Sequence, residues 1–305
     1  MSVVVLPSVP GLGGLYARGA AAAARLAVAR RAGRAPSSLP SVTYEVRGVR
    51  ASSSALEAYQ RLVGEPANDV IPAGYVHVLA FPVATALMVR PDFPLPLPGM
   101  VHLANRVTQV RPVLVSESLD VSATATGLRA HRSGTQLDLV VEVRVGDELV
   151  WRGVSTYLAK GVRLTPAGAP SGSSNEPAAP TASSNEPAPF VAPLPTAQWR
   201  LAADTGRRYA AVSGDRNPIH LSKLSAKALG FPRAIAHGMY TAARALAEVG
   251  AVRGDAFEWS VEFVKPVLLP GTAAVAIRRE GDSYTVQAWN TRTGKPHLLS
   301  KITPR

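Results

Sequence analysis

An internal repeat constrains the fold of this chain more than any other feature. The segment VTQVRPVLVSESLDV, residues 107–121, aligns with VEFVKPVLLPGTAAV, residues 261–275, at a constant offset of 154 positions. Six positions are identical, and Arg111 of the first copy stands opposite Lys265 of the second. A repeat at this distance predicts a structural unit that occurs twice in the chain.

Both copies lie in similar surroundings. Each is preceded by one Ala-rich helical stretch, at 80–89 and at 238–249. After each copy come segments that alternate apolar and polar residues, at 137–145 and 149–159 in the first half and at 273–279, 284–289 and 296–302 in the second. Alternation with a period of two predicts half-buried antiparallel strands. One helix with a run of antiparallel strands, present twice, predicts an α+β duplication.

A low-complexity segment separates the two halves. Residues 165–195 are rich in Pro, Ala and Ser, and SSNEPA occurs at 173–178 and again at 183–188. Such a composition cannot bury a core and predicts a linker. We therefore divide the chain into a basic Ala/Arg-rich segment (1–39), a first unit (40–163), the linker (164–195) and a second unit (196–305).

The charge of the chain limits its partners. The net charge is +12, with an isoelectric point near 10.4, which suits an anionic partner. The basic residues are scattered without interleaved aromatic residues, so we expect no nucleic acid partner. No cysteine is present, which excludes disulfides and thiolate chemistry and fits a cytoplasmic protein.

The first 34 residues contain five arginines and no acidic residue. Their stretch GLYARGAAAAARLAVARRAGR, residues 14–34, favours a helix. A helix packed on the domain, a loose basic arm and a transit-like or membrane-surface helix all stay open. The charge follows the apolar part, unlike a secretory signal, and no apolar run reaches the ~20 residues of a transmembrane helix.

One short stretch carries the chemistry. In YAAVSGDRNPIHLSKLSA, residues 209–226, a Gly-Asp-x-Asn-Pro turn directs Asp215 and His220 toward the same small space. Taken alone, Asp215 and Asn217 could simply cap a helix. Two further stretches follow, FPRAIAHGMYTAA at 231–243 and FVKPVLLPGT at 263–272.

Together these stretches resemble the MaoC-like (R)-specific enoyl-thioester hydratases, over residues 197–305. The whole arrangement is similar to the double hot-dog 3-hydroxyacyl-thioester dehydratases of mycobacteria. The resemblance implies an α+β double hot-dog fold, in which each unit has a long central helix wrapped by an antiparallel sheet. It also implies reversible hydration of trans-2-enoyl thioesters to (R)-3-hydroxyacyl thioesters in fatty-acid metabolism.

The resemblance implies a role for each site residue. Asp215 and His220 would be the acid–base pair that handles one water, because both protons of a syn addition lie on one face. The Gly238 N–H at a helix start would stabilise the thioester oxygen. Asn217 would orient the pair or the thioester. Supporting positions are Ser213 and Tyr209 in the loop and His237, which contacts the ligand or belongs to the core.

The first unit lacks these features. Asn68 and Asp69 occur there, but no histidine follows at the required spacing. We place its helix entry near Phe81–Pro82, where proline has no N–H to offer. His77 and His102 are interpreted as structural. The first unit is therefore expected to be non-catalytic and to shape the acyl channel with residues 60–105.

The implied partners are an acyl-CoA or acyl-carrier-protein thioester and, within the chain, the two units as an internal pseudo-dimer; a further pairing of two chains stays open. Lys265, Arg233 and Lys223 lie near the motif and could meet phosphates. No cofactor and no metal are expected. Two other functions stay open: a hot-dog acyl-thioesterase and a non-catalytic acyl-thioester-binding subunit of a dehydratase complex.

Overall fold

The computed structural model describes residues 1–164 and 190–305. Most of the expected linker therefore lies outside the described residues. The elements of the first half are β1 (Ser2–Val5), α1 (Leu12–Arg31), β2 (Val42–Val49), α2 (Ser53–Val63), α3 (Ala73–Met88), β3 (Met100–Gln109), β4 (Leu119–His131), β5 (Gly134–Val145) and β6 (Glu148–Lys160). Those of the second half are β7 (Ala197–Leu201), α4 (Thr205–Ser213), η1 (Pro218–His220), α5 (Lys223–Ala228), α6 (Gly238–Val249), η2 (Gly250–Arg253), β8 (Phe257–Phe263), β9 (Gly271–Glu280), β10 (Ser283–Asn290) and β11 (Pro296–Pro304).

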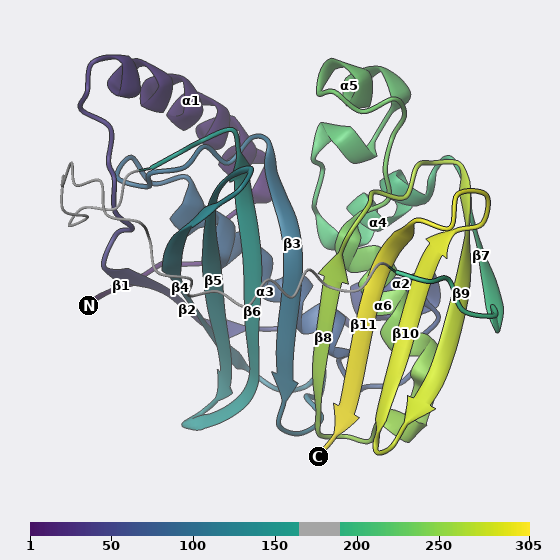
Figure 1. The fold of residues 1–305 in the computed structure, drawn as a ribbon. Helices are drawn as coiled ribbons and strands as arrows, with labels where there is room; N and C mark the ends of the chain where they lie inside the picture. The colour runs from purple at the N-terminus through teal and green to yellow at the C-terminus, as the bar shows by residue number, and fades with distance from the viewer. Residues whose placement is uncertain (165–189) are drawn as a thin grey trace, which may run out of the picture.

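The strands of the described residues form one eleven-stranded sheet, in the order β1-β2-β4-β5-β6-β3-β8-β11-β10-β9-β7. The order of the first unit, from β2 to β3, is repeated in reverse by the second unit, from β8 to β7. The two units meet where β3 pairs antiparallel with β8, with Asn105 opposite Val261 (Figure 1). The predicted α+β duplication is confirmed, and its two copies share a continuous sheet.

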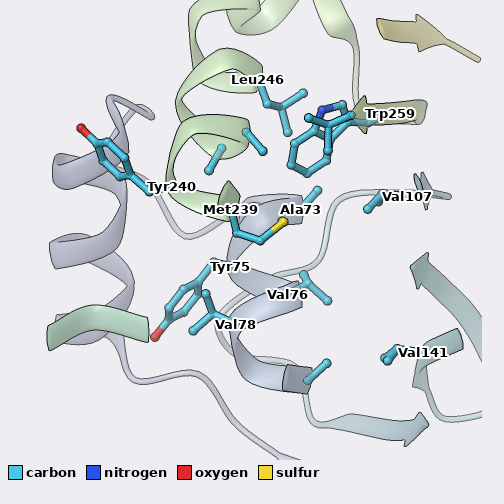
Figure 2. Packing of buried hydrophobic residues seen from close by; sticks show 14 of the residues in the cluster. Ala73, Tyr75, Val76, Val78, Val107, Val141, Met239, Tyr240, Leu246 and Trp259 are labelled. Atoms are coloured by element: carbon cyan, nitrogen blue, oxygen red, sulfur yellow. The ribbon is translucent and has the colours of Figure 1, made fainter. Parts of the chain in front are cut away.

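The central helices of both units contribute to one core. Helix α3 is apolar on nearly every side, as expected for a helix surrounded by protein. Figure 2 shows Met239 of α6 pointing toward α3, beside Ala73. A Cβ atom added to Gly74 would lie 3.2 Å from the Cβ atom of Ala243, so α3 and α6 approach closely at this glycine. The two units therefore share their interior as well as their sheet.

The predicted helix entry of the first unit is wrong. Helix α3 begins at Ala73, and Pro82 lies inside it rather than at its start. Proline in a helix interior removes one backbone hydrogen bond, which is why the sequence favoured a helix start at that position. Here Pro82 is buried within a helix held by tertiary packing, and such packing outweighs local propensity.

Two isolated bridges identify the true counterpart of Gly238. They occur three residues before each central helix, between Val70 and Leu114 in the first unit and between Ile235 and Leu268 in the second. Ala73 therefore occupies the position of Gly238, and it has a backbone N–H. The presence of Pro82 predicted that the first unit has no backbone N–H donor at its helix start. That prediction is wrong, because the helix starts at Ala73.

Helix α1 packs on the domain, which decides among the three alternatives for this segment. Leu12 and Leu15 lie in a small buried cluster with Ala86 and Val89 near the end of α3. Arg30 donates a hydrogen bond from Nη2 to the carbonyl of Pro94 at 2.6 Å. Across the described residues, no helix has both the length and the apolarity that crossing a bilayer requires.

Candidate active site

The loop between α4 and η1 fixes the position of Asp215. Helix α4 ends at Ser213, and the φ of +72° at the following Gly214 turns the chain sharply. The Ser213 hydroxyl donates to the carbonyl of Tyr209 at 2.8 Å and accepts from the Asp215 N–H at 3.2 Å. These two hydrogen bonds of Ser213 fix the start of the loop, and Asp215 is half-buried there.

Asn217 acts through both its backbone and its side chain. Its N–H donates to Asp215 Oδ1 at 3.1 Å, which orients the carboxylate. Its side-chain oxygen accepts from the Ile219 N–H at 3.4 Å and so caps the short helix η1. The capping role that the sequence offered as the simpler explanation is therefore present, together with a direct contact to the carboxylate.

One ring nitrogen of His220 makes a hydrogen bond, and the other makes none within the part of the chain that the structure describes. Its Nδ1 donates to the carbonyl of Ile235 at 2.8 Å, which leaves Nε2 as the acceptor of a neutral ring. Burial lowers the pKa of His220, so the ring is neutral near pH 7. A neutral imidazole with a free Nε2 can accept a proton from water.

His237 stacks on His220, with ring centroids 3.6 Å apart. Its Nε2 donates to the backbone carbonyl of Asp215 at 3.0 Å and lies 3.8 Å from the carboxylate oxygen Oδ2. Burial lowers the pKa of His237 to about 3. Its Nδ1 is buried and has no hydrogen-bond partner among the described residues. His237 therefore lies in the site as a neutral ring stacked on His220 and beside Asp215.

The carboxylate of Asp215 is ionised at neutral pH. Burial alone would raise its pKa. The facing imidazoles and the hydrogen bonds from Tyr16 and Asn217 outweigh burial and hold the pKa below its usual value. The Tyr16 hydroxyl donates to Oδ1 at 2.5 Å, although Tyr16 is 199 positions away in the sequence.

Gly238 begins helix α6 directly after His237. The N–H groups in the first turn of a helix have no partner within the helix, and the positive end of the helix dipole lies there. A Cβ atom at Gly238 would lie 3.0 Å from the ring of Phe263. Glycine thus leaves room beside an aromatic wall for a group that approaches the main chain.

Comparison with known proteins identifies the family. The MaoC like domain matches residues 183–299. The 3-hydroxyacyl-thioester dehydratase X of Mycobacterium tuberculosis is 36% identical over 264 residues, which are 87% of this chain and 90% of that protein. The chain belongs to the MaoC-like family.

Two solved structures agree with the fold. The crystal structure of HtdX from M. tuberculosis has a TM-score of 0.73 at 34% identity, with 86% of this chain and 100% of that chain covered. A second M. tuberculosis protein, described as a double hot-dog, has a TM-score of 0.50 at 16% identity and covers 84% of this chain and 92% of its own. The double hot-dog fold of this MaoC-like chain is thereby confirmed.

Three groups of the site could together bind a metal ion. Ligand atoms of Asp215, His220 and His237 lie within 4.8 Å of one another. In both histidines one ring nitrogen already bonds a backbone carbonyl. Such carbonyl bonds orient histidines in metal sites and in acid–base pairs alike, so the expectation of a metal-free site stays a prediction.

The first unit contributes side chains that the sequence did not connect to this site. His102 stacks on Tyr157 at 4.5 Å and lies 4.9 Å from the ring of Phe263, which borders Gly238. His77 stacks on His102 at 6.2 Å. Burial lowers the pKa of His77 to about 4 and that of His102 to about 3. His102 lies on β3, which pairs with β8, and His77 lies on α3, so both neutral rings reach the site through contacts between the units that no local pattern encodes.

Proposed function

We propose that this MaoC-like chain is an (R)-specific hydro-lyase that interconverts trans-2-enoyl and 3-hydroxyacyl thioesters in fatty-acid metabolism. The observation that carries the proposal is the meeting of three groups at one point. These are the ionised Asp215, the free Nε2 of neutral His220, and the start of helix α6 at Gly238. The overall similarity to a curated dehydratase supports the same reaction class.

Dehydration requires one proton to be taken from C2 and one to be given to the hydroxyl on C3. We assign the C2 proton to the carboxylate of Asp215 and the hydroxyl to His220. The proton passes within the pair, the C3–O bond breaks, and water leaves. Hydration reverses these steps, with His220 accepting the proton of the attacking water. The pair ends each turnover in its starting state, and such acid–base catalysis is worth ~10²–10⁴-fold.

Negative charge develops on the thioester oxygen during either direction. We place this oxygen at the N–H of Gly238, where the helix dipole and the free donor favour an anion. His237 precedes this residue and fixes the loop through its bond to the Asp215 carbonyl. The donor and the acid–base pair are thereby parts of one rigid segment.

The division of the chain belongs to the same proposal. The second unit, residues 196–305, supplies the acid–base pair and the donor. The first unit, residues 40–163, supplies the wall of the acyl channel, and residues 60–105 set part of its length. The segment 164–195 connects them.

A basic cleft offers a place for the phosphates of coenzyme A. It has a volume of about 290 Å³, and Arg233 and Arg292 are among its lining residues. Arg233 precedes Ile235, whose carbonyl holds His220. If this cleft binds coenzyme A, Arg292→Ala should raise KM for an enoyl-CoA several-fold and leave KM for an enoyl-pantetheine unchanged. An equal change for both substrates would contradict this placement.

The reaction itself is tested with purified protein and two substrates, crotonyl-CoA and a C8–C12 trans-2-enoyl-CoA. We expect loss of the conjugated enoyl absorbance and formation of the (R)-3-hydroxy product, and abolition of both in Asp215→Asn. Release of free thiol would instead indicate a thioesterase. Binding without turnover on coenzyme A and carrier-protein substrates would indicate a non-catalytic subunit.

A further inference from the structure

Helix α1 reaches the candidate active site from outside both hot-dog units. Leu12 and Tyr16 lie one turn apart on this helix and face consecutive residues of the catalytic loop. A Cβ atom at Gly214 would lie 3.2 Å from Leu12 Cδ1, and the Tyr16 hydroxyl donates to Asp215 Oδ1 at 2.5 Å. One face of α1 thus covers the loop at the carboxylate.

The helix is held firmly enough to position its side chains. Leu15 is fully buried, and a Cβ atom added to Gly19 would lie 2.9 Å from Leu97 Cδ2. Glycine at position 19 therefore permits a close approach of α1 to the segment after α3. Tyr16 extends from a docked helix, which limits the number of rotamers it can adopt.

In the contact between Tyr16 and Asp215, the tyrosine is the hydrogen-bond donor. Burial and the neighbouring Asp215 carboxylate raise the pKa of Tyr16, so the phenol stays protonated and donates. Oδ1 of Asp215 then receives two donors, from Tyr16 and from the Asn217 N–H. Oδ2 receives no hydrogen bond from the described residues and is left for substrate.

We propose that Tyr16 is a positioning residue that fixes the rotamer of Asp215 for catalysis by donating a hydrogen bond to Oδ1. Segment 1–39 is then part of the active site rather than an appendage. The proposed role in turnover rests on the hydratase function, whereas the effect of Tyr16 on the ionisation of Asp215 does not.

Other titratable groups surround the same carboxylate: His77 on α3, His102 on β3, Tyr157 on β6, Tyr209 on α4, His220 on η1 and His237 before α6. Burial lowers the pKa of these histidines and raises the pKa of these tyrosines, so all are neutral near pH 7. A hydrogen-bond donor to Asp215 therefore has a large influence on its ionisation.

The test compares Tyr16→Phe with Tyr44→Phe. Tyr44 packs against the same small cluster, but its hydroxyl accepts from Arg90 at 2.8 Å and does not contact Asp215. For Tyr16→Phe we expect kcat to fall about ten-fold with little change in KM, because a hydrogen bond to an ionised group is lost. The pKa of Asp215 should rise, so the acid limb of the pH–rate profile should move up by about one pH unit.

An NMR titration, which needs no enzymatic turnover, tests the role of Tyr16 independently of the proposed hydratase function. The rings of His220 and His237 lie beside the Asp215 carboxylate, so their ring protons should report its ionisation in an NMR titration. An acid transition that moves upward in Tyr16→Phe but not in Tyr44→Phe supports the proposal even if the wild type does not hydrate enoyl thioesters. An unmoved transition in folded Tyr16→Phe overturns it. Gly19→Leu, which forces α1 outward, should reproduce the shift; a folded Gly19→Leu with a wild-type transition also counts against the proposal.

Discussion

The first and second units have the same strand order, but they differ in the segment between their helices. In the first unit, α2 and α3 are joined by residues 64–72, whereas in the second unit residues 214–237 lie between α4 and α6. The longer segment contains Asp215, His220 and His237. The comparison teaches that the two units share one framework, and that a longer segment before the central helix brings a carboxylate and two imidazoles together in the second unit.

The largest expected effect comes from this loop. His220→Ala should lower kcat by ~10²–10⁴-fold, because the acceptor for the water proton is lost. Asp69→Asn, in the corresponding loop of the first unit, should leave kcat unchanged. Steady-state kinetics on a trans-2-enoyl-CoA measure both. A comparable loss in Asp69→Asn would show that the first unit also takes part in the chemistry.

The second test compares the two helix starts. Gly238→Ala should lower kcat by about 10- to 100-fold, since its Cβ atom would lie 3.0 Å from the Phe263 ring and displace the donor. Ala73→Gly, at the matching position of α3, should leave kcat unaffected. Kinetics with a thermal unfolding control distinguish the two. A wild-type kcat in a folded Gly238→Ala protein would show that the backbone N–H donor does not require glycine at this position.

The smallest effect concerns stability in acid. The buried histidines of both units have lowered pKa values, so the unfolded chain binds more protons below about pH 6.5. Stability is therefore complete above that pH and declines toward about pH 3, where His102 itself titrates. His102→Phe should reduce the loss at pH 5 by about 1–2 kcal/mol.

Thermal unfolding at pH 7 and pH 5 measures this difference in stability. Activity at pH 7 is measured for the same variant and compared with that of variants at His220. His102→Phe should retain near wild-type turnover, whereas substitutions at His220 should not. An equal pH dependence in His102→Phe and wild type would mean that another group dominates acid unfolding.

Local sequence patterns predicted much of this molecule. Strand alternation and the repeat identified two α+β units, and the turn residues around Asp215 brought carboxylate and imidazole into one loop. These features depend on neighbours in the sequence. The start of α3 was misjudged because packing around Pro82 outweighs the usual preference of proline for helix starts.

Contacts between positions far apart in the sequence could not be predicted from these local patterns. Tyr16 lies in an Ala- and Arg-rich helix with no motif, and its bond to Asp215 joins positions 199 apart. His77 and His102 were interpreted as structural because no carboxylate lies near them in the sequence. The close approach of α3 to α6 brings His77 into the field of Asp215, and the position of β3 beside β8 does the same for His102.

The junction of β3 and β8 also bears on assembly. Each of these strands would be a bare edge in an isolated unit, and bare edges recruit other strands. Because both units belong to one polypeptide, each edge meets its partner at a high effective concentration, and intermolecular pairing competes poorly. A single polypeptide thus guarantees one copy of each unit in every molecule, a stoichiometry that two separate chains would reach only by sorting unlike from like.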